Sequence, residues 1–258
     1  LSKYVLNEGQ WIRSKRQRMQ ELIDWNALSE DIWTAVRFLD DSIDINVYPL
    51  TEIEKMHKGN RKIGLGVMGW ADMLIMLGIP YAHKKAFNLA CHVMSFVNKT
   101  SKKRGVFPNF KGSIYDKPGM PEVRNATTTT IAPTGTLSTV ADCSSGIEPI
   151  FALAYRRLVL DMEFSEINKH FLKAAGKGGF YSADVINKML KNGTLHGIKE
   201  VPLQIKKLFR TALEISPEAH IEMQASFQKY TDNAVSKTIN LPNRAKKENV
   251  ANAFIMAY

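Results

Sequence analysis

A run of four threonines, followed by a proline and a Thr-Gly-Thr turn, is the feature that most restricts how this chain can fold. The stretch NATTTTIAPTGTLSTVADCSSGIEP covers residues 125–149. The β-branched residues at 127–131 favour an extended strand, and Pro133 cannot continue a hydrogen-bonded ladder. From Thr136 onward the sequence favours a short helix, which we expect Gly146 to end in a left-handed conformation. The stretch therefore predicts a strand, a tight turn and a helix in succession.

The start of this predicted helix is suited to binding an anion. The backbone N–H groups of residues 134–138 lack helical partners there, and the helix dipole adds partial positive charge. Gly135 would let a phosphate approach the backbone closely. Hydroxyl groups that could also donate belong to Thr134, Thr136 and Ser138. An ordinary N-cap is the alternative that the residue types leave open, because Ser, Thr and Gly are favoured there for capping alone.

The composition predicts a folded protein without a membrane anchor. The chain has 258 residues, of which 45% are hydrophobic, and no apolar run approaches the ~18 residues of a membrane span. Two cysteines, Cys91 and Cys143, are too few for a disulfide scaffold or a structural zinc site, so we expect no metal and a cytoplasmic location. The first residues show neither a signal peptide nor an initiator methionine, so we expect a piece of a longer chain.

A formal net charge of +10 suggests attraction to phosphates, either on nucleotides or on nucleic acid. The lysines are scattered among helical segments, and aromatic residues are not interleaved with them as in single-strand binders. The densest basic run, RSKRQR at residues 13–18, is weak support for any partner. Solvated helix faces are therefore favoured, and a nucleic-acid partner is disfavoured.

Hydrophobic spacing predicts a single domain, mostly helical, with a few buried strands. In one helix, Ser29 is expected to be the cap, and Ile32 and Val36 begin the buried face. GLGVMG, at residues 64–69, has only the glycine spacing of a dinucleotide fingerprint, because no clear strand precedes it. A short strand is expected in VSKTINLP. Further helices are predicted within 61–81, near 84–98, 163–174, 183–191 and 203–214, and from Ser216.

Several long motifs resemble one family in the same order along the chain. They are AVRFLDDSIDINVYPL, RKIGLGVMGWADMLIMLGIPY, RGVFPNF, the threonine-rich stretch continued as IFALAYRR, PEAHIEMQASFQKYTDNAVSKTINLP and ENVANAFIMAY. Together they are similar to the C-terminal catalytic half of ribonucleotide reductase large chains, most of all the adenosylcobalamin-dependent class II enzymes. The resemblance implies that residues 1–258 form one fragment of that catalytic barrel.

The resemblance also implies a fold and a site. The fold is α/β, a helix-rich partial ten-stranded barrel that lacks the N-terminal half and the last strand. In the family, the matching turn holds the substrate diphosphate through backbone amides and hydroxyls. Here that turn is Thr134, Gly135, Thr136, Leu137 and Ser138. The implied cofactor is adenosylcobalamin. The implied partners are a ribonucleotide substrate, the missing N-terminal half and a thioredoxin-type reductant, and a homodimer of the complete enzyme is allowed.

No catalytic residue is expected in this chain. The family's radical cysteine lies in an Asn-Pro-Cys-Gly-Glu loop, which the sequence does not contain, so the isolated chain is expected to be inactive. Cys91 is interpreted as a buried helical thiol, and Cys143 as a residue to which the family assigns no catalysis. A structural role is favoured for Glu148, and neither Lys237 nor Asn240 is assigned to catalysis.

Two alternatives remain at this point. A class I large chain would share the barrel and the phosphate turn, although CSSGIEPIFALAYRR favours class II. A non-catalytic nucleotide-binding remnant would fit the missing cysteine loop equally well. The residues do not decide between diphosphate and triphosphate substrates.

Overall fold

The structure is a computed structural model that describes residues 1–6, 19–101, 105–159 and 162–258. The basic run at residues 13–18 lies outside the described residues. No described helix is long and apolar enough to cross a membrane. The helices are α1 (Trp25–Ile45), α2 (Thr51–Asn60), α3 (Trp70–Met76), α4 (Lys84–Ser101), α5 (Gly135–Val140), α6 (Lys169–Gly178), α7 (Ala183–Asn192), α8 (Leu203–Leu208), α9 (Pro217–Gln228) and α10 (Lys247–Ala257). Two strands, β1 (Ala154–Val159) and β2 (Met162–Ile167), and the 3₁₀ turns Ser2–Tyr4, Met19–Leu22 and Ala212–Glu214 complete the described elements.

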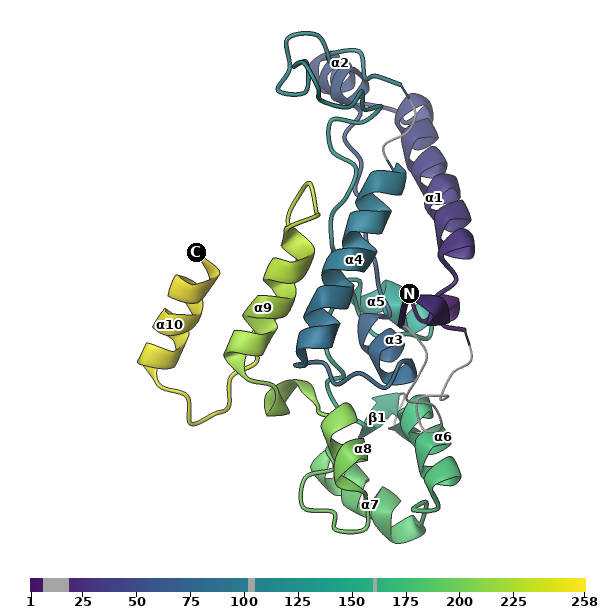
Figure 1. Cartoon of the computed structure of the whole chain (residues 1–258), viewed down its shortest axis with the longest axis vertical. Helices are drawn as coiled ribbons and strands as arrows, with labels where there is room; N and C mark the ends of the chain where they lie inside the picture. Colours follow the sequence, from purple (N-terminus) through teal and green to yellow (C-terminus); the bar gives the residue numbers. More distant parts are fainter. Residues whose placement is uncertain (7–18, 102–104, 160–161) are drawn as a thin grey trace.

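Three helices form the centre of the larger core. α4 lies between α1 and α9, and α10 packs on the far side of α9 (Figure 1). α1 begins five residues earlier than the sequence predicts, because its cap is Asp24 and not Ser29; the Asp24 side chain accepts the Ala27 N–H at 3.0 Å. The buried face of α4 fills the space between its neighbours and includes Phe87, Ala90, Val93, Met94 and Val97.

The threonine run is extended, as predicted, and lies between two other extended segments. Isolated parallel bridges join Leu65 to Thr129 and Ile131 to Val235. The Thr130 N–H donates to the Leu65 carbonyl at 3.0 Å, and the Ile131 N–H donates to the Ala234 carbonyl at 3.1 Å. The strand predicted in VSKTINLP is reduced to its single bridge at Val235. Segment 127–131 is therefore the middle of three parallel segments.

The glycines of GLGVMG serve this close packing. A Cβ atom on Gly66 would lie 2.4 Å from the Thr130 carbonyl oxygen, and one on Gly64 would lie 2.5 Å from the Thr130 methyl carbon. Gly69 adopts a φ of +76° at the start of α3. Since these contacts account for all three glycines, the motif needs no nucleotide to explain it.

A second core gathers residues between 150 and 209, together with Ile75 of α3. Phe171 of α6, Met189 of α7 and Phe209 are almost fully buried within it. The helix predicted near 163–174 is wrong in its first part, because Met162–Ile167 pairs antiparallel with Ala154–Val159. α6 begins only after Asn168, whose side chain accepts the Phe171 N–H at 3.0 Å.

A buried ion-pair network ties α1 and α2 to the chain just before the threonine run. Arg61, which has a φ of +51° at the end of α2, donates to Asp40 Oδ1 at 2.8 Å and to both carboxylate oxygens of Asp44. Asp40 also accepts from Arg124 and from the Asn125 amide. Burial by itself would raise the pKa of Asp40, but the hydrogen bonds from Arg61, Asn125 and Arg124 outweigh it and hold that pKa below its usual range.

We expect Arg61→Ala to lower the free energy of unfolding by about 3–5 kcal/mol, because the buried Asp40 carboxylate would lose its main partner. The matched control is Arg37→Ala, which removes an exposed pair with Asp41 and should change stability by less than about 1 kcal/mol. Urea unfolding of both variants measures the difference. Equal losses would contradict the importance given to the network.

The same network predicts sensitivity to acid. Because the folded-state pKa of Asp40 is lowered, its contribution is complete above the unfolded pKa of about 3.9 and is lost as the pH falls further. We expect the unfolding free energy of the wild-type chain to decline below about pH 4 more steeply than that of Arg61→Ala. Urea titrations at several pH values test this, and parallel curves would refute it.

Candidate phosphate-binding loop

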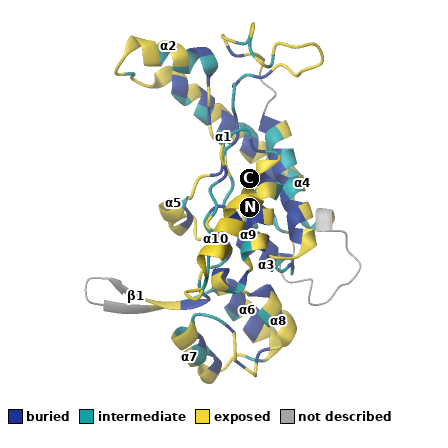
Figure 2. Ribbon diagram, turned by 90° about the vertical axis from the view of Figure 1, so that its left-hand side faces the viewer, coloured by how far each residue is buried: buried dark blue, intermediate teal, exposed yellow. Residues whose placement is uncertain are grey.

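The candidate site is the loop at residues 132–147, called here the phosphate loop. It leaves the middle of the three parallel segments at Ile131 and carries α5 at its exposed end. Figure 2 shows α5 set apart from the buried core with mostly exposed residues. The sequence predicted this succession of extended segment, turn and short helix.

Three backbone amides at the start of α5 have no helical partner. The first bond of the helix runs from the Ser138 N–H to the Thr134 carbonyl at 2.8 Å, so the N–H groups of Gly135, Thr136 and Leu137 precede it. All three residues are exposed. A Cβ atom on Gly135 would meet nothing within 4 Å. The geometry leaves room for an anion at these amides.

Thr134 holds the loop closed at its base. It adopts φ +55° and ψ +28°, a left-handed conformation that costs a residue with a side chain roughly 1–2 kcal/mol. Its Oγ1 accepts the Gly146 N–H at 2.8 Å, which joins the two ends of the loop. The hydroxyl hydrogen of Thr134 is not used in that bond and remains available to donate.

Ser138 is turned into the loop. Its side chain is buried, and its hydroxyl donates to the Gly135 carbonyl at 3.0 Å and lies 2.7 Å from the Ser145 hydroxyl. In this structure both partners of the hydroxyl belong to the loop itself. The Ser138 N–H makes the first bond of α5, so it ends the row of free amides.

Gly146 has a different role from the one predicted. α5 ends at Val140, and the left-handed residue that follows it is Asp142, with a φ of +48°. Gly146, with a φ of +45°, lies at the loop exit, where a Cβ atom would be 3.2 Å from the Ala132 carbonyl oxygen. The left-handed conformation predicted for Gly146 is therefore correct, but the glycine is required by the contact with Ala132 and not by the end of the helix.

The buried Asp72 of α3 anchors the returning half of the loop. Its Oδ2 accepts the Ser144 N–H at 2.6 Å, and its own N–H donates to the Ser144 hydroxyl at 3.3 Å. The Gly69 N–H donates to the Ser144 carbonyl at 2.7 Å. His170 of α6 lies 3.5 Å from the other Asp72 oxygen. The returning half of the loop therefore packs against the start of α3.

A buried polar cluster follows the loop. Glu148 accepts from the Lys237 ammonium at 2.6 Å, and that ammonium is 2.8 Å from His220 Nδ1. Burial lowers the pKa of Lys237, and the Glu148 carboxylate opposes the effect. Burial also lowers the pKa of His220, with a further contribution from the nearby Lys237 charge. The interpretation of Glu148 as structural is consistent with this cluster, in which its carboxylate contacts Lys237 and Thr238 and no residue of α5.

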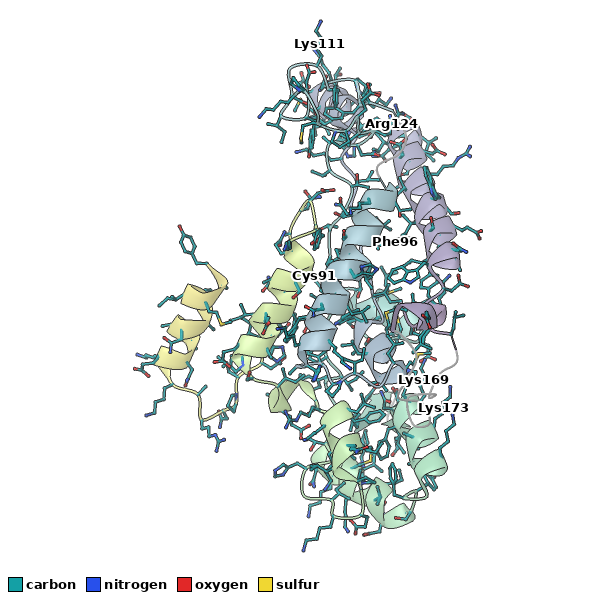
Figure 3. All side chains as sticks on the ribbon, viewed as in Figure 1. Cys91, Phe96, Lys111, Arg124, Lys169 and Lys173 are labelled. Carbon is teal, nitrogen blue, oxygen red and sulfur yellow. The ribbon has the colours of Figure 1, made fainter. Side chains whose placement is uncertain are left out.

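The two thiols do not form a reactive pair in the described structure. Both cysteines are free. Burial raises the pKa of the Cys143 thiol, which reduces its thiolate fraction. Cys91 faces α9 from α4, with its Sγ 3.4 Å from the Ser226 carbonyl (Figure 3). Cys91 is only partly buried, so the expectation of a buried thiol is wrong in that respect.

Sequence reasoning did not find His220. Nothing around it in PEAHIEMQ singles it out, and its partner Lys237 lies 17 residues away. Glu148 and Lys237 were noticed separately, but their contact spans 89 residues of sequence. Val235 pairs with Ile131, and Lys237 lies two residues after Val235. A correct prediction of this pairing would have indicated that Lys237 lies near Glu148.

The chain is similar to one protein family over nearly its whole length. The chain matches the family described as "Ribonucleotide reductase, barrel domain" over residues 1–122 and 117–258. It is 49% identical over 244 residues to a vitamin B12-dependent ribonucleoside-diphosphate reductase of Thermoplasma acidophilum, which covers 91% of this chain and 32% of that protein. A Mycobacterium tuberculosis protein with the same description is 39% identical, over 92% of this chain and 35% of its own length.

A solved structure shares the fold. The class Id ribonucleotide reductase alpha subunit of Actinobacillus ureae superposes with a TM-score of 0.73 at 19% identity, covering 89% of this chain and 43% of that one. The chain spans about a third of the length of the curated relatives named above. It belongs to the ribonucleotide reductase barrel family.

Two glycines of the loop should respond differently to alanine. Gly146→Ala is expected to lower the free energy of unfolding by about 1–3 kcal/mol, because a side chain is strained at its positive φ and meets the Ala132 carbonyl. Gly135→Ala should change it by less than about 0.5 kcal/mol, because the site is open and exposed. Urea unfolding compares them, and equal effects would show that the loop geometry is wrong.

Proposed function

We propose that this chain forms the substrate-diphosphate-binding part of the catalytic barrel of a vitamin B12-dependent ribonucleoside-diphosphate reductase. The observation that carries the proposal is the row of three amides that precede the first bond of α5, at the exposed residues 135–137, in a chain whose Thermoplasma relative is 49% identical. The complete enzyme would convert ribonucleotides to deoxyribonucleotides for DNA synthesis and act in the cytoplasm.

The three parallel segments support a place in the family's ten-stranded α/β barrel. Segment 127–131 has a neighbour on each side, as an interior barrel strand requires, and helices α4 and α9 pack beside it through the shared core. We propose that residues 1–258 form one part of that barrel, and that the remaining strands come from the part of the relatives that this chain does not span.

Substrate binding would use main-chain groups first. The N–H groups of Gly135, Thr136 and Leu137 and the dipole of α5 favour a negative charge at this point. Thr134 can add its hydroxyl hydrogen, whereas Ser138 contributes by fixing the shape of the loop. We propose the diphosphate as the ligand, because the relatives are named for diphosphate substrates.

The chemistry would need groups beyond this chain. By family resemblance, a cysteine radical removes the ribose 3′-hydrogen, the 2′-hydroxyl leaves as water, and two thiols are oxidised to a disulfide. The 3′-hydrogen is then returned to the ribose, which regenerates the cysteine radical. A thioredoxin-type reductant would then restore the thiols. The loop that carries the radical cysteine is absent from the printed sequence. The isolated chain is therefore proposed to bind nucleotide without turnover, and the complete enzyme, which the family resemblance allows to be a homodimer, to perform the reaction.

Adenosylcobalamin would supply the radical that starts this reaction. A cobalamin holds its cobalt in its own corrin ring, so it does not require a cluster of protein ligands. The described residues contain no group of three or more His, Cys, Asp or Glu side chains that could hold a metal ion. We therefore assign no residue of this chain to the cofactor and derive no step through it.

A class I large chain is the weaker candidate. Both relatives named above carry vitamin B12 in their descriptions, at 49% and 39% identity, whereas the class Id structure is only 19% identical and speaks for the fold alone. A non-catalytic remnant remains the second candidate, because it would bind diphosphates through the same loop.

The substitution Gly135→Leu tests the loop. A leucine side chain would fill the open space in front of the amides, so we expect affinity for cytidine diphosphate to fall at least about tenfold, the equivalent of about 1.4 kcal/mol. Stability should change little. The control is Gly176→Leu, which has the same open surroundings but lies on α6. Calorimetric titration measures both, and an unchanged affinity in folded Gly135→Leu would refute the site.

An activity assay separates an enzyme part from a self-sufficient enzyme. The purified chain is given cytidine diphosphate, adenosylcobalamin and a dithiol, and deoxycytidine diphosphate is measured by chromatography. We expect none, because the sequence lacks the radical-cysteine loop. Turnover by the chain alone would overturn the proposal that this loop must be supplied from elsewhere.

A further inference from the structure

The Lys237 ammonium lies in a cage that uses all of its hydrogens. Its side chain is 0% exposed, and the nitrogen donates to Glu148 Oε2 at 2.6 Å and to the Thr238 carbonyl at 2.6 Å. His220 Nδ1, at 2.8 Å, is the third partner. An ammonium group has three donors and no acceptor, so every one of them is satisfied here.

These contacts fix the histidine and the carboxylate as well. Since the ammonium can only donate, His220 Nδ1 must accept, and the proton lies on Nε2, 3.1 Å from the Ala212 carbonyl. The second oxygen of Glu148 accepts the Thr238 N–H at 2.6 Å. On the other side, Tyr81 donates to the Ile147 carbonyl at 2.5 Å. The exit of the phosphate loop is thus held on two sides.

The entrance of the phosphate loop is held by the same piece of chain. Ile131 donates to the Ala234 carbonyl at 3.1 Å and accepts the Ser236 N–H at 2.8 Å. Glu148, the first residue after the loop, is bound to Lys237 and Thr238, which are one and two residues beyond Ser236. One five-residue segment, 234–238, therefore holds both ends of a loop that is closed on itself by the bond between Thr134 and Gly146.

We propose that segment 234–238 is a clamp that sets the conformation of the phosphate loop, with Lys237 and Glu148 as positioning residues for the substrate diphosphate. The inference rests on the proposed function, because it assumes that the loop binds the diphosphate. Neither side chain needs to touch the substrate. They act by holding the two ends of the loop in fixed positions relative to each other.

The energetic reason is preorganisation. Backbone amides bind a phosphate well only when the loop is ordered before the ligand arrives, since ordering it on binding reduces the affinity. The Lys237 side chain is fully buried and the Glu148 side chain is 24% exposed. Such an ion pair adds little net stability but defines one geometry, because the buried ammonium is costly without its partner. Thermodynamic linkage then requires the ligand to stabilise the clamp as much as the clamp favours the ligand.

Lys237→Met tests the clamp, with Lys188→Met as a matched control. Lys188 also contacts two carboxylates, Asp184 and Glu200, but is exposed on α7. We expect Lys237→Met to bind inorganic pyrophosphate about fivefold or more weakly and to shift the amide NMR signals of residues 135–137. Lys188→Met should behave as the wild-type chain. A folded Lys237→Met with wild-type affinity and wild-type amide signals would overturn the clamp.

Amide hydrogen exchange in the wild-type chain gives a second test that does not depend on a variant folding. Pyrophosphate should slow exchange at residues 135–137 and also at Ser236 and Thr238. Slowing at 135–137 alone would overturn the clamp and leave the proposed function standing. No slowing anywhere would count against the proposed function itself.

Discussion

The parallel pairing of the threonine segment with its two neighbours is the constraint on which the rest of the structure depends. It places segment 127–131 beside Leu65 on one side and Val235 on the other. The glycines at 64 and 66 allow the first approach, because any side chain there would collide with Thr130. This pairing fixes the direction in which the chain leaves Ile131, and therefore the direction in which the phosphate loop starts.

The buried charges are arranged around the same segment. The Arg61 and Asp40 network joins α1 and α2 to Asn125, immediately before the threonines. The Glu148 and Lys237 cluster joins the chain after the loop to the neighbouring segment. If one of the parallel segments shifted in register, the charged partners in each network would separate. A buried charge left without its partner costs several kcal/mol. Both therefore favour one register of the parallel segments over its alternatives.

The membership of the ribonucleotide reductase family could be predicted from long motifs, because they extend over nearly the whole chain in order. Much of the helical content could be predicted too, as the cap at Ser216 and the buried α3 show. The predictions failed where hydrogen bonds distant in sequence decide. Residues 162–167 pair with β1 in place of forming a helix, and VSKTINLP makes one bridge and not a full strand.

The succession of extended segment, turn and short helix at residues 127–140 follows from the sequence, because β-branching, proline and helix-end preferences act on the nearest neighbours. The absence of a side chain at Gly135 also predicts that a phosphate can approach the backbone there. Tertiary structure decided that Ser138 is turned inward, that Gly146 closes against Ala132, and that Lys237 and His220 meet Glu148. These contacts join residues far apart in the chain, so they exist only once the parallel segments have aligned.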